Sequence, residues 1–421
     1  MAVGSAGLRK IYEDIRASYW AIPAAFVLAA IVLGTFLAWL DRNPDLAPLP
    51  LPDYWIDEQG DGARTVLSTI ASTIIGVAGV MFSMTLVAVS FAAGNFGPRL
   101  IGNFMRDRGT QVSFGLLLGT FTFAMFILRN MRGPVDDVAP FVPQYSLVVA
   151  MALMVLSIFT MIYYVHHVPE TINVSNIASD LGHRFSRDIR ALVEAREDVD
   201  TDRPAERDRP VQTDIHIDAP GYIQQLDRDT LFDIARDNDW IIEVHSHPGT
   251  FLSPHVPVMT VRSDAEIGDE DLETLNGTVA TGNARTEDQA TPFIGDQLCE
   301  MVARALSPGF NDPFTAMNCL NWLHAGLMEA LHYRGGLPPL ETRRVVLHFT
   351  DFGDLLRPFE DCAPYTLTDR MARLRHLDLT RSLIAHAGDG HPQAGRLQRL
   401  ARALDRPTEE VDLGPETSKV A

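Results

Sequence analysis

The chain has 421 residues, enough for two or three domains, and 46% of them are hydrophobic. The formal net charge is −19. The first 167 residues carry ten basic and eleven acidic side chains, so −18 of this charge belongs to the remainder. A surface of that sign argues against nucleic acid as a partner. The cysteines Cys299, Cys319 and Cys362 are odd in number and lack a short metal-type spacing, which argues against a disulfide framework.

Four apolar segments predict an α-helical membrane domain in residues 1–167. The spans lie at about 20–40, 66–93, 109–128 and 145–165. Each is long enough to cross the ~30 Å hydrocarbon core of a bilayer as a helix. The first span continues into Leu40-Asp41-Arg42 without a small-residue cleavage site, so we expect a retained anchor and not a signal peptide.

The placement of the arginines predicts how these spans are oriented. The amino terminus and the connector between the second and third spans are net positive, whereas the loop after the first span is strongly acidic. Because positive loops stay on the cytoplasmic side, we expect the amino terminus inside and the first loop outside. Four spans return the chain to the cytoplasm, so we expect a multi-pass protein of a bacterial inner membrane with a cytosolic carboxy-terminal region.

The second span carries a stripe of small and polar residues within a stretch, 65–98, that has no charged side chain over 34 residues. The members of the stripe are Ser68, Ser72, Gly76, Gly79, Ser83 and Ser90. Their spacings of three, four or seven place them on one face of a helix. Two interpretations stay open: close packing of helices, which small residues permit, or a water-filled pore built by copies of this helix and gated at Phe82 or Met84.

Arginines gather after the second span, at Arg99, Arg106 and Arg108. One interpretation is positive-inside topology with contact to lipid phosphates. The other is a cationic ring at an inner pore mouth, which would favour anions. The acidic outer loop argues in the opposite direction, so the ion selectivity stays open.

The second half predicts a cytosolic α+β region. We expect a connecting helix and linker at 168–210, a small β-rich unit at 211–264, a mainly helical domain at 265–405 and a disordered tail at 406–421. The β-rich unit resembles a barrel-sandwich hybrid of the biotinyl or lipoyl type, without the lysine to which such a cofactor is attached. His245, His247 and His255 are interpreted as structural or surface histidines, since parallel side chains on one strand rarely converge on a metal. We expect no cofactor and no metal.

A helix–turn–helix joint is predicted at residues 307–316, where Pro308-Gly309 ends one helix and Asp312 caps the next. A role as a contact for a ligand or another subunit stays open for this joint. The residues concerned are Ser307, Asn311, Asp312 and Thr315, with Arg285, Thr286 and Asp288 docking against them. We find no convergent acid–base set here or elsewhere, so no catalytic residues and no enzymatic activity are expected.

Several of these motifs occur together in a known pattern. Phe82-Ser83, Gly97-Pro98-Arg99, Arg285-Thr286 and the run ALSPGFNDPFTA at 305–316 resemble a bacterial family of predicted integral membrane proteins of unknown function. The resemblance covers most of the chain. It implies four amino-terminal spans and a cytosolic region, and it implies no activity.

These observations lead to two hypotheses about function. The first is a homo-oligomeric inner-membrane channel or channel-like pore, lined by the second span, with a cytosolic vestibule or sensor domain. The alternative is a membrane-anchored scaffold or sensor that binds a cytosolic partner without transport. The expected partners are membrane lipids, further copies of the chain and, for a pore, inorganic ions.

Overall fold

The computed structural model describes residues 18–43, 60–97, 104, 107–131, 142–197, 209–286, 290–331, 344–347, 350–388 and 390–405. The chain divides into two compact units, Asp14–Asn173 and Val174–Ala421. The first unit holds four apolar helices, and the second holds two small sheets and the remaining helices. The expected fold class, a helical membrane domain followed by an α+β region, is confirmed.

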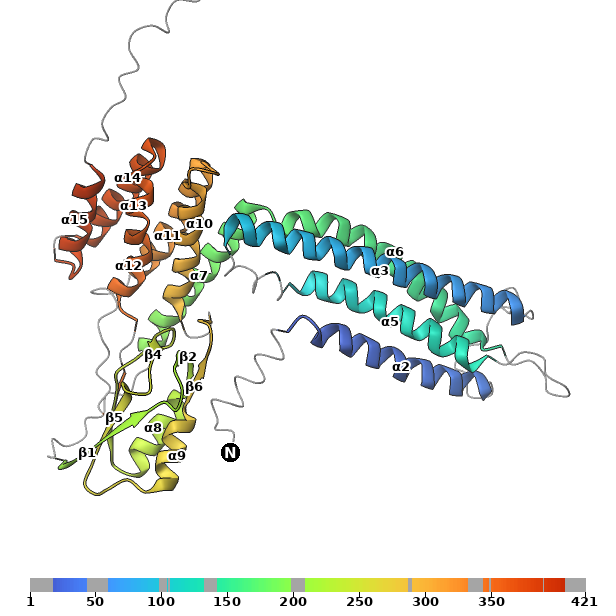
Figure 1. Ribbon diagram of the computed structural model, residues 1–421, viewed down its shortest axis with the longest axis horizontal. Coiled ribbons are helices and arrows are strands. Elements are labelled where there is room, and N and C mark those ends of the chain that lie inside the picture. Colours follow the sequence, from blue (N-terminus) through green and yellow to red (C-terminus); the bar gives the residue numbers. More distant parts are fainter. Residues whose placement is uncertain are drawn as a thin grey trace, which may run out of the picture. The chain divides into compact units, whose positions relative to one another are not determined.

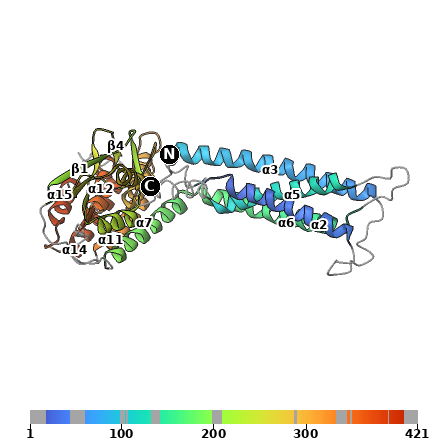
Figure 2. The same cartoon turned by 90° about the horizontal axis from the view of Figure 1, so that it is seen from below.

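Four helices form the first unit, and each is long and apolar enough to cross a membrane. They are α2 (Ala21–Arg42), α3 (Gly60–Phe96), α5 (Arg108–Asn130) and α6 (Gln144–Thr171). They run side by side (Figures 1 and 2). Helices α5 and α6 each contact the other three, and α5 is the more central of the two, because half of its apolar stretch is buried against 22% of that of α6. Only 17% of the apolar stretch of α3 is buried, the lowest share of the four.

Small residues let α2 approach α5 closely. A Cβ atom on Gly115 would lie 2.8 Å from the ring of Phe26 on α2, so only glycine fits there. Polar contacts complete the packing of the bundle. The Thr120 and Ser157 hydroxyls are 3.0 Å apart between α5 and α6. The Asp41 carboxylate at the end of α2 accepts hydrogen bonds from the first turn of α6, at 2.8 Å from the Tyr145 amide.

The β-rich part of the second unit contains two sheets. The first has the order β1 (Val211–His216), β5 (Pro257–Ser263), β3 (Ile241–Val244) and β7 (Val345–Leu347), and the second β4 (Phe251–Leu252), β2 (Gly221–Leu226) and β6 (Val279–Gly282). All pairs are antiparallel except β3 with β7. Strands β6 and β7 come from beyond residue 264, so the sheets extend past the range expected from the sequence. Helices α8 (Arg228–Asp237) and α9 (Asp269–Gly277) accompany them.

The helical part of the second unit is built around α11 (Pro313–Leu331), which contacts α7 (Val174–Glu197), α10 (Thr291–Ala305) and α14 (Arg370–Ala387). Phe185 of α7 is fully buried, and a Cβ atom on Gly326 would lie 2.3 Å from its ring. Helix α7 is therefore part of this core. Three helices complete the unit: α12 (Phe352–Asp361), α13 (Ala363–Thr366) and α15 (Ala394–Leu404).

Candidate functional site

The small-residue stripe lies on the exposed side of α3. All six of its members, Ser68, Ser72, Gly76, Gly79, Ser83 and Ser90, are exposed in the single chain. A Cβ atom placed on Gly76 or Gly79 would meet no heavy atom within 4 Å. At about 100° per residue, the six positions fall within an arc of about 80° of the helix surface. The stripe is therefore narrow and open, and between Ser83 and Ser90 it is interrupted by the exposed side chain of Leu86, which falls in the same arc.

The opposite side of α3 packs against the rest of the bundle. Its buried residues include Leu67, Ile74, Ala78 and Met81, each less than a tenth exposed. These positions centre roughly 150° from the middle of the stripe. The sequence pattern alone gives the stripe but not its direction. In the part of the unit that the structure describes, the stripe lies on the side of α3 opposite its buried residues.

The hydroxyl groups of the stripe donate to their own helix. The Ser68 Oγ donates to the Thr65 carbonyl at 3.0 Å, that of Ser72 to Thr69 at 3.2 Å and that of Ser83 to Gly79 at 3.0 Å. A hydroxyl that donates its one hydrogen keeps its oxygen lone pairs available. The exposed face of α3 therefore presents hydrogen-bond acceptors.

The expected gate residues lie on the two flanks of the stripe. The Phe82 ring lies 5.7 Å from the ring of Phe114 on α5 and is 41% exposed. Met84 lies on the other flank and is 47% exposed. Neither side chain lies at the centre of the stripe. If copies of α3 surrounded a common axis, a ring of either residue would therefore narrow the lumen only from the flanks of the stripe.

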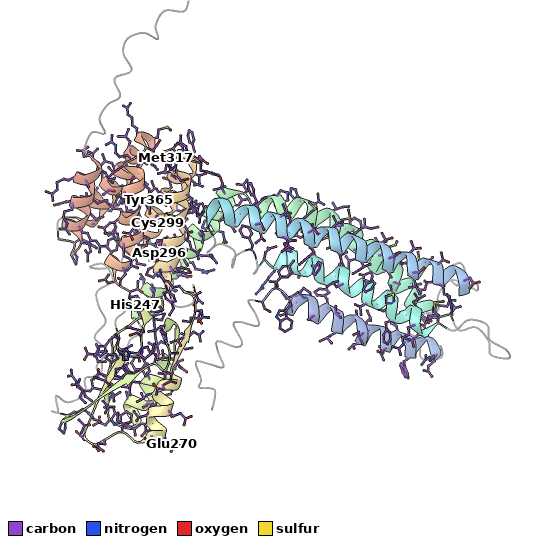
Figure 3. The ribbon with its side chains drawn as sticks, viewed as in Figure 1. His247, Glu270, Asp296, Cys299, Met317 and Tyr365 are labelled. Atoms are coloured by element: carbon purple, nitrogen blue, oxygen red, sulfur yellow. The ribbon has the colours of Figure 1, made fainter. Side chains whose placement is uncertain are left out.

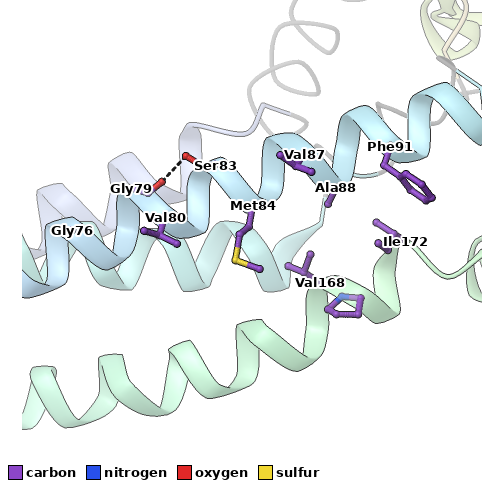
Figure 4. A pocket seen from close by; sticks show the side chains of 11 residues that line it. Gly76, Gly79, Val80, Ser83, Met84, Val87, Ala88, Phe91, Val168 and Ile172 are labelled. Carbon is purple, nitrogen blue, oxygen red and sulfur yellow. Dashed lines mark hydrogen bonds between the residues drawn. The ribbon is translucent and has the colours of Figure 1, made fainter.

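An apolar groove adjoins the stripe between α3 and the end of α6 (Figure 4). Its volume is about 770 Å³. Gly79 and Ser83 form one edge, Met84 and Phe91 line its length, and Val168 closes it from α6. The groove therefore places an uncovered apolar surface directly beside the polar stripe.

A polar cluster joins the beginning of α5 to the end of α6. The Asp107 carboxylate accepts a hydrogen bond from the Thr110 amide at 2.8 Å, which caps α5, and its Oδ2 lies 2.9 Å from the His167 Nε2. Burial opposes ionisation of Asp107, but the hydrogen bonds from Thr110 and His167 outweigh it, and the pKa of this carboxyl lies below its usual value. The His167 ring also stacks on Tyr163, with ring centroids 5.0 Å apart.

Sequence reasoning missed this cluster. Asp107 followed by Thr110 is a recognisable cap signal, but its partner His167 lies 60 residues away in the chain. Of the three arginines expected near this end of the spans, Arg108 is exposed at the start of α5. Arg99 and Arg106 lie outside the described residues.

The joint between α10 and α11 has the predicted capping geometry. Asp312 accepts hydrogen bonds from the Thr315 amide at 3.1 Å and the Thr315 hydroxyl at 2.6 Å. Ser307 donates to the Arg304 carbonyl at 2.7 Å, and Asn311 has a positive φ of 45°. These residues hold the turn itself, and Asn311 is exposed at its surface.

The expected docking of Arg285 against this joint is not seen. Arg285 pairs instead with Asp296 at 2.5 Å and lies 4.7 Å above the Phe293 ring, both near the beginning of α10. The joint follows the other end of α10, and Figure 3 shows Asp296 well separated from Met317 next to the joint. The Arg285 guanidinium thus interacts with the Asp296 carboxylate and the Phe293 ring. Thr286 is half-buried nearby in the chain, and Asp288 lies outside the described residues.

The histidines of the β-rich part serve hydrogen bonding. The Nε2 of His245 lies 2.7 Å from the Thr260 hydroxyl, which in turn donates to Asp214 at 2.7 Å. The Nδ1 of His247 lies 3.0 Å from the Pro248 carbonyl. The contacts of Thr260 link the segment after β3 to β5 and β1, whereas the contact of His247 lies within the turn that follows.

Comparison with known proteins agrees with this architecture. The profile of the predicted membrane protein family DUF2254 matches residues 16–380. Similar chains are "Uncharacterized protein Rv1290c" of Mycobacterium tuberculosis and "Uncharacterized protein Mb1321c" of Mycobacterium bovis, each 24% identical over 323 residues. The match covers 75% of this chain and spans 61% of the length of either relative. No solved structure matches. With four apolar amino-terminal helices and a family match over most of its length, the chain belongs to the DUF2254 family of predicted membrane proteins.

Proposed function

We propose that this protein is a homo-oligomeric inner-membrane channel or channel-like pore, lined by α3, with the second unit acting as a cytosolic vestibule or sensor. The observation that carries the proposal is the outward direction of the stripe. Its serines and glycines are exposed, and a Cβ atom on Gly76 or Gly79 would meet no heavy atom of the described residues within 4 Å. Copies of α3 around a common axis would turn this acceptor-rich face towards water instead of acyl chains.

The physical reason is the cost of polar groups in lipid. An acceptor that faces hydrocarbon without a partner is unfavourable, whereas the same acceptor in a water-filled lumen is solvated. Helix α3 has 37 residues, or about 55 Å of helix, well beyond the ~30 Å hydrocarbon core. Such a helix spans the full thickness of the hydrocarbon core, and its remaining turns extend beyond the core.

In the alternative function, copies of α3 also assemble, but they pack directly against one another without water between them. Glycines and serines at spacings of three and four also allow two α3 helices to pack closely, and the groove beside Gly79 is apolar. A dry α3 interface would leave a membrane-anchored scaffold or sensor for a cytosolic partner. The two functions differ in whether water reaches the stripe.

Cysteine accessibility decides between them. Ser72→Cys, Gly76→Cys and Ser83→Cys are treated with a membrane-impermeant thiol reagent, with the wild-type chain as the background for its own cysteines. The matched control is Val32→Cys, on the lipid-exposed side of α2 and 69% exposed. The pore predicts labelling of all three stripe cysteines and none of the control. Protected stripe cysteines that cross-link between copies would favour the dry scaffold.

Single-channel recording of the purified protein in planar bilayers gives the direct test. Discrete conductance steps are expected in the wild type. Ser83→Phe should block them, because the added ring fills the stripe at its narrow acceptor face, whereas Val32→Phe should conduct normally. Absence of conductance across voltage, pH and membrane tension would refute the pore.

A further inference from the structure

We propose that Cys299 and Cys362 form a thiol pair that a peroxide oxidises reversibly to a disulfide. This inference concerns the second unit and does not depend on the proposed pore. The chain has three cysteines, and in the helical part of this unit their thiols interact electrostatically with one another. Cys299 lies near the middle of α10 (Figure 3), Cys319 belongs to α11, and Cys362 directly follows α12.

The backbones of α10 and α12 approach each other closely one turn before the two cysteines. A Cβ atom on Gly295 would lie 2.9 Å from the Cγ of Pro358, so only glycine fits against this proline. Cys299 follows Gly295 by four residues on α10. Cys362 follows Pro358 by four residues at the end of α12, so each cysteine shares a helix face with the residue that makes the contact. A disulfide needs Cα atoms within about 7 Å of each other, and this close approach favours such a distance.

The two thiols are in contact one turn beyond this point. The thiol of Cys362 hydrogen-bonds with that of Cys299, and its Sγ also lies 3.2 Å from the Pro358 carbonyl oxygen. In the part of the chain that the structure describes, no three histidine, cysteine or acidic side chains are placed to hold a metal ion. The cluster therefore has the chemistry of a thiol pair.

Exposure and protonation give the cysteines different roles. Cys299 is partly exposed, whereas Cys319 and Cys362 are fully buried, so a dissolved peroxide reaches Cys299 first. Burial and the hydrogen bond with Cys299 raise the pKa of the Cys362 thiol well above its usual value. The proton of this hydrogen bond therefore stays on Cys362, and the Cys299 sulfur accepts it. Burial raises the pKa of Cys319 to about 12, so Cys319 stays an unreactive thiol.

The oxidation consists of two balanced steps. The Cys299 thiolate attacks one oxygen of hydrogen peroxide. The S–O bond forms, the O–O bond breaks, and the leaving hydroxide becomes water with the proton that Cys299 had released, which gives a sulfenic acid. The Cys362 sulfur then attacks the Cys299 sulfur, and the sulfenic oxygen leaves as water with the Cys362 proton. Two thiols and one peroxide thus give one disulfide and two waters, and the two electrons that the sulfurs lose are gained by the peroxide.

Such a disulfide is a switch and not part of a permanent framework. On the cytosolic side that we propose for this unit, the cellular thiol pool keeps cysteines reduced, and a disulfide there is transient. When formed, it joins α10 to the end of α12 and closes a loop of about 60 residues. The oxidised protein should therefore unfold at a higher temperature than the reduced one.

Peptide mapping of the full-length protein in detergent tests this pair. The protein is treated with hydrogen peroxide, and its free thiols are blocked with N-ethylmaleimide under denaturing conditions. Tryptic peptides are then analysed by mass spectrometry, because arginines place the three cysteines on separate peptides. We expect two peptides joined through Cys299 and Cys362 that dithiothreitol separates, full blocking of Cys319, and an upward shift of the unfolding temperature that dithiothreitol reverses.

Three serine variants separate the roles of the cysteines. Cys299→Ser should form neither a disulfide nor a sulfenic acid. Cys362→Ser should stop at the Cys299 sulfenic acid, which a cyclic diketone traps. Cys319→Ser is the matched control and should form the disulfide at the wild-type rate. Oxidation of the chain unfolded in urea should give a mixture of the three possible pairings.

Four results would overturn the proposal. They are a disulfide of the native protein that involves Cys319, oxidation of Cys299 to a sulfinic acid while Cys362 stays free, the same mixture of pairings in the native and unfolded chains, and resistance of Cys299 to peroxide that oxidises free glutathione. The map of the wild type decides the question even if a buried serine prevents a variant from folding. None of these results bears on the pore, which the accessibility of the stripe tests separately.

Discussion

Replacing Gly109 with alanine should release the end of α6 from the beginning of α5. A Cβ atom at this position would lie 2.5 Å from the Nε2 of His167 and 2.7 Å from the hydroxyl of Tyr163. Ordinary contacts between such atoms are about 1 Å longer, so the His167 ring must move. Its 2.9 Å contact with Asp107 is then lost.

The magnitude follows from two opposing effects. Loss of a hydrogen bond to a charged group costs about 1.5–3 kcal/mol. Alanine in place of glycine in a helix contributes about 1 kcal/mol in the stabilising direction. We therefore expect a net loss of about 0.5–2 kcal/mol, visible as a lower midpoint of thermal unfolding in detergent.

Gly94→Ala is the control for this experiment. It makes the same chemical change inside α3, at a position where a Cβ atom meets no heavy atom within 4 Å. It should be neutral or slightly stabilising. If Gly109→Ala is as stable as Gly94→Ala, the polar cluster does not hold α5 and α6 together, and the reasoning is refuted.

Three further predictions concern the second unit. Asp312→Ala removes the cap of α11 and should cost about 1 kcal/mol in unfolding free energy, while Asp312→Asn should keep most of it. His376 is fully buried, and desolvation lowers its pKa to about 3. The unfolded chain thus binds a proton that the folded chain does not. As the pH is lowered from roughly 6.5 to 3, the free energy of unfolding should fall by about 1.4 kcal/mol per pH unit. His376→Leu should flatten this slope in chemical denaturation, and an unchanged slope would contradict the assignment. Gly326→Ala should overpack the ring of Phe185 and cost about 1–3 kcal/mol, measured by the same denaturation.

Local signals predicted the membrane helices well, because hydrophobic length is a property of contiguous residues. Each of the four predicted spans coincides closely with one of the four apolar helices observed. The bounds differ most at α3, which begins at Gly60 where the acidic loop was expected to continue. An aspartate and two glycines do not prevent a first helical turn, since acids near a helix amino terminus are favourable. The cap at Asp312 was equally predictable, as its partner Thr315 is three residues away.

Contacts between distant residues could not be predicted in this way. Strand β7 pairs with β3 about a hundred residues earlier, and no periodicity in either segment indicates its partner. The same holds for Asp107 with His167. Arg285 is an example. It was expected to dock against the joint at residues 307–316, but its guanidinium pairs with the carboxylate of Asp296 near the beginning of α10. Composition shows that a charge needs a partner, and only the fold shows which one.

The direction of the stripe bears directly on the choice between the two functions. Serines that donate to their own helix reduce the cost of facing lipid, so the stripe alone is compatible with either a dry interface or a wet lumen. Asp61 does not discriminate between them, because it lies in the first turn of α3, before the predicted span, and stays hydrated in either assembly. The decisive property is therefore the solvent access of residues in the middle of the helix. Cysteines at Ser72, Gly76 and Ser83 should react with a membrane-impermeant thiol reagent if water lies along α3, and they should be protected if copies of α3 pack against one another.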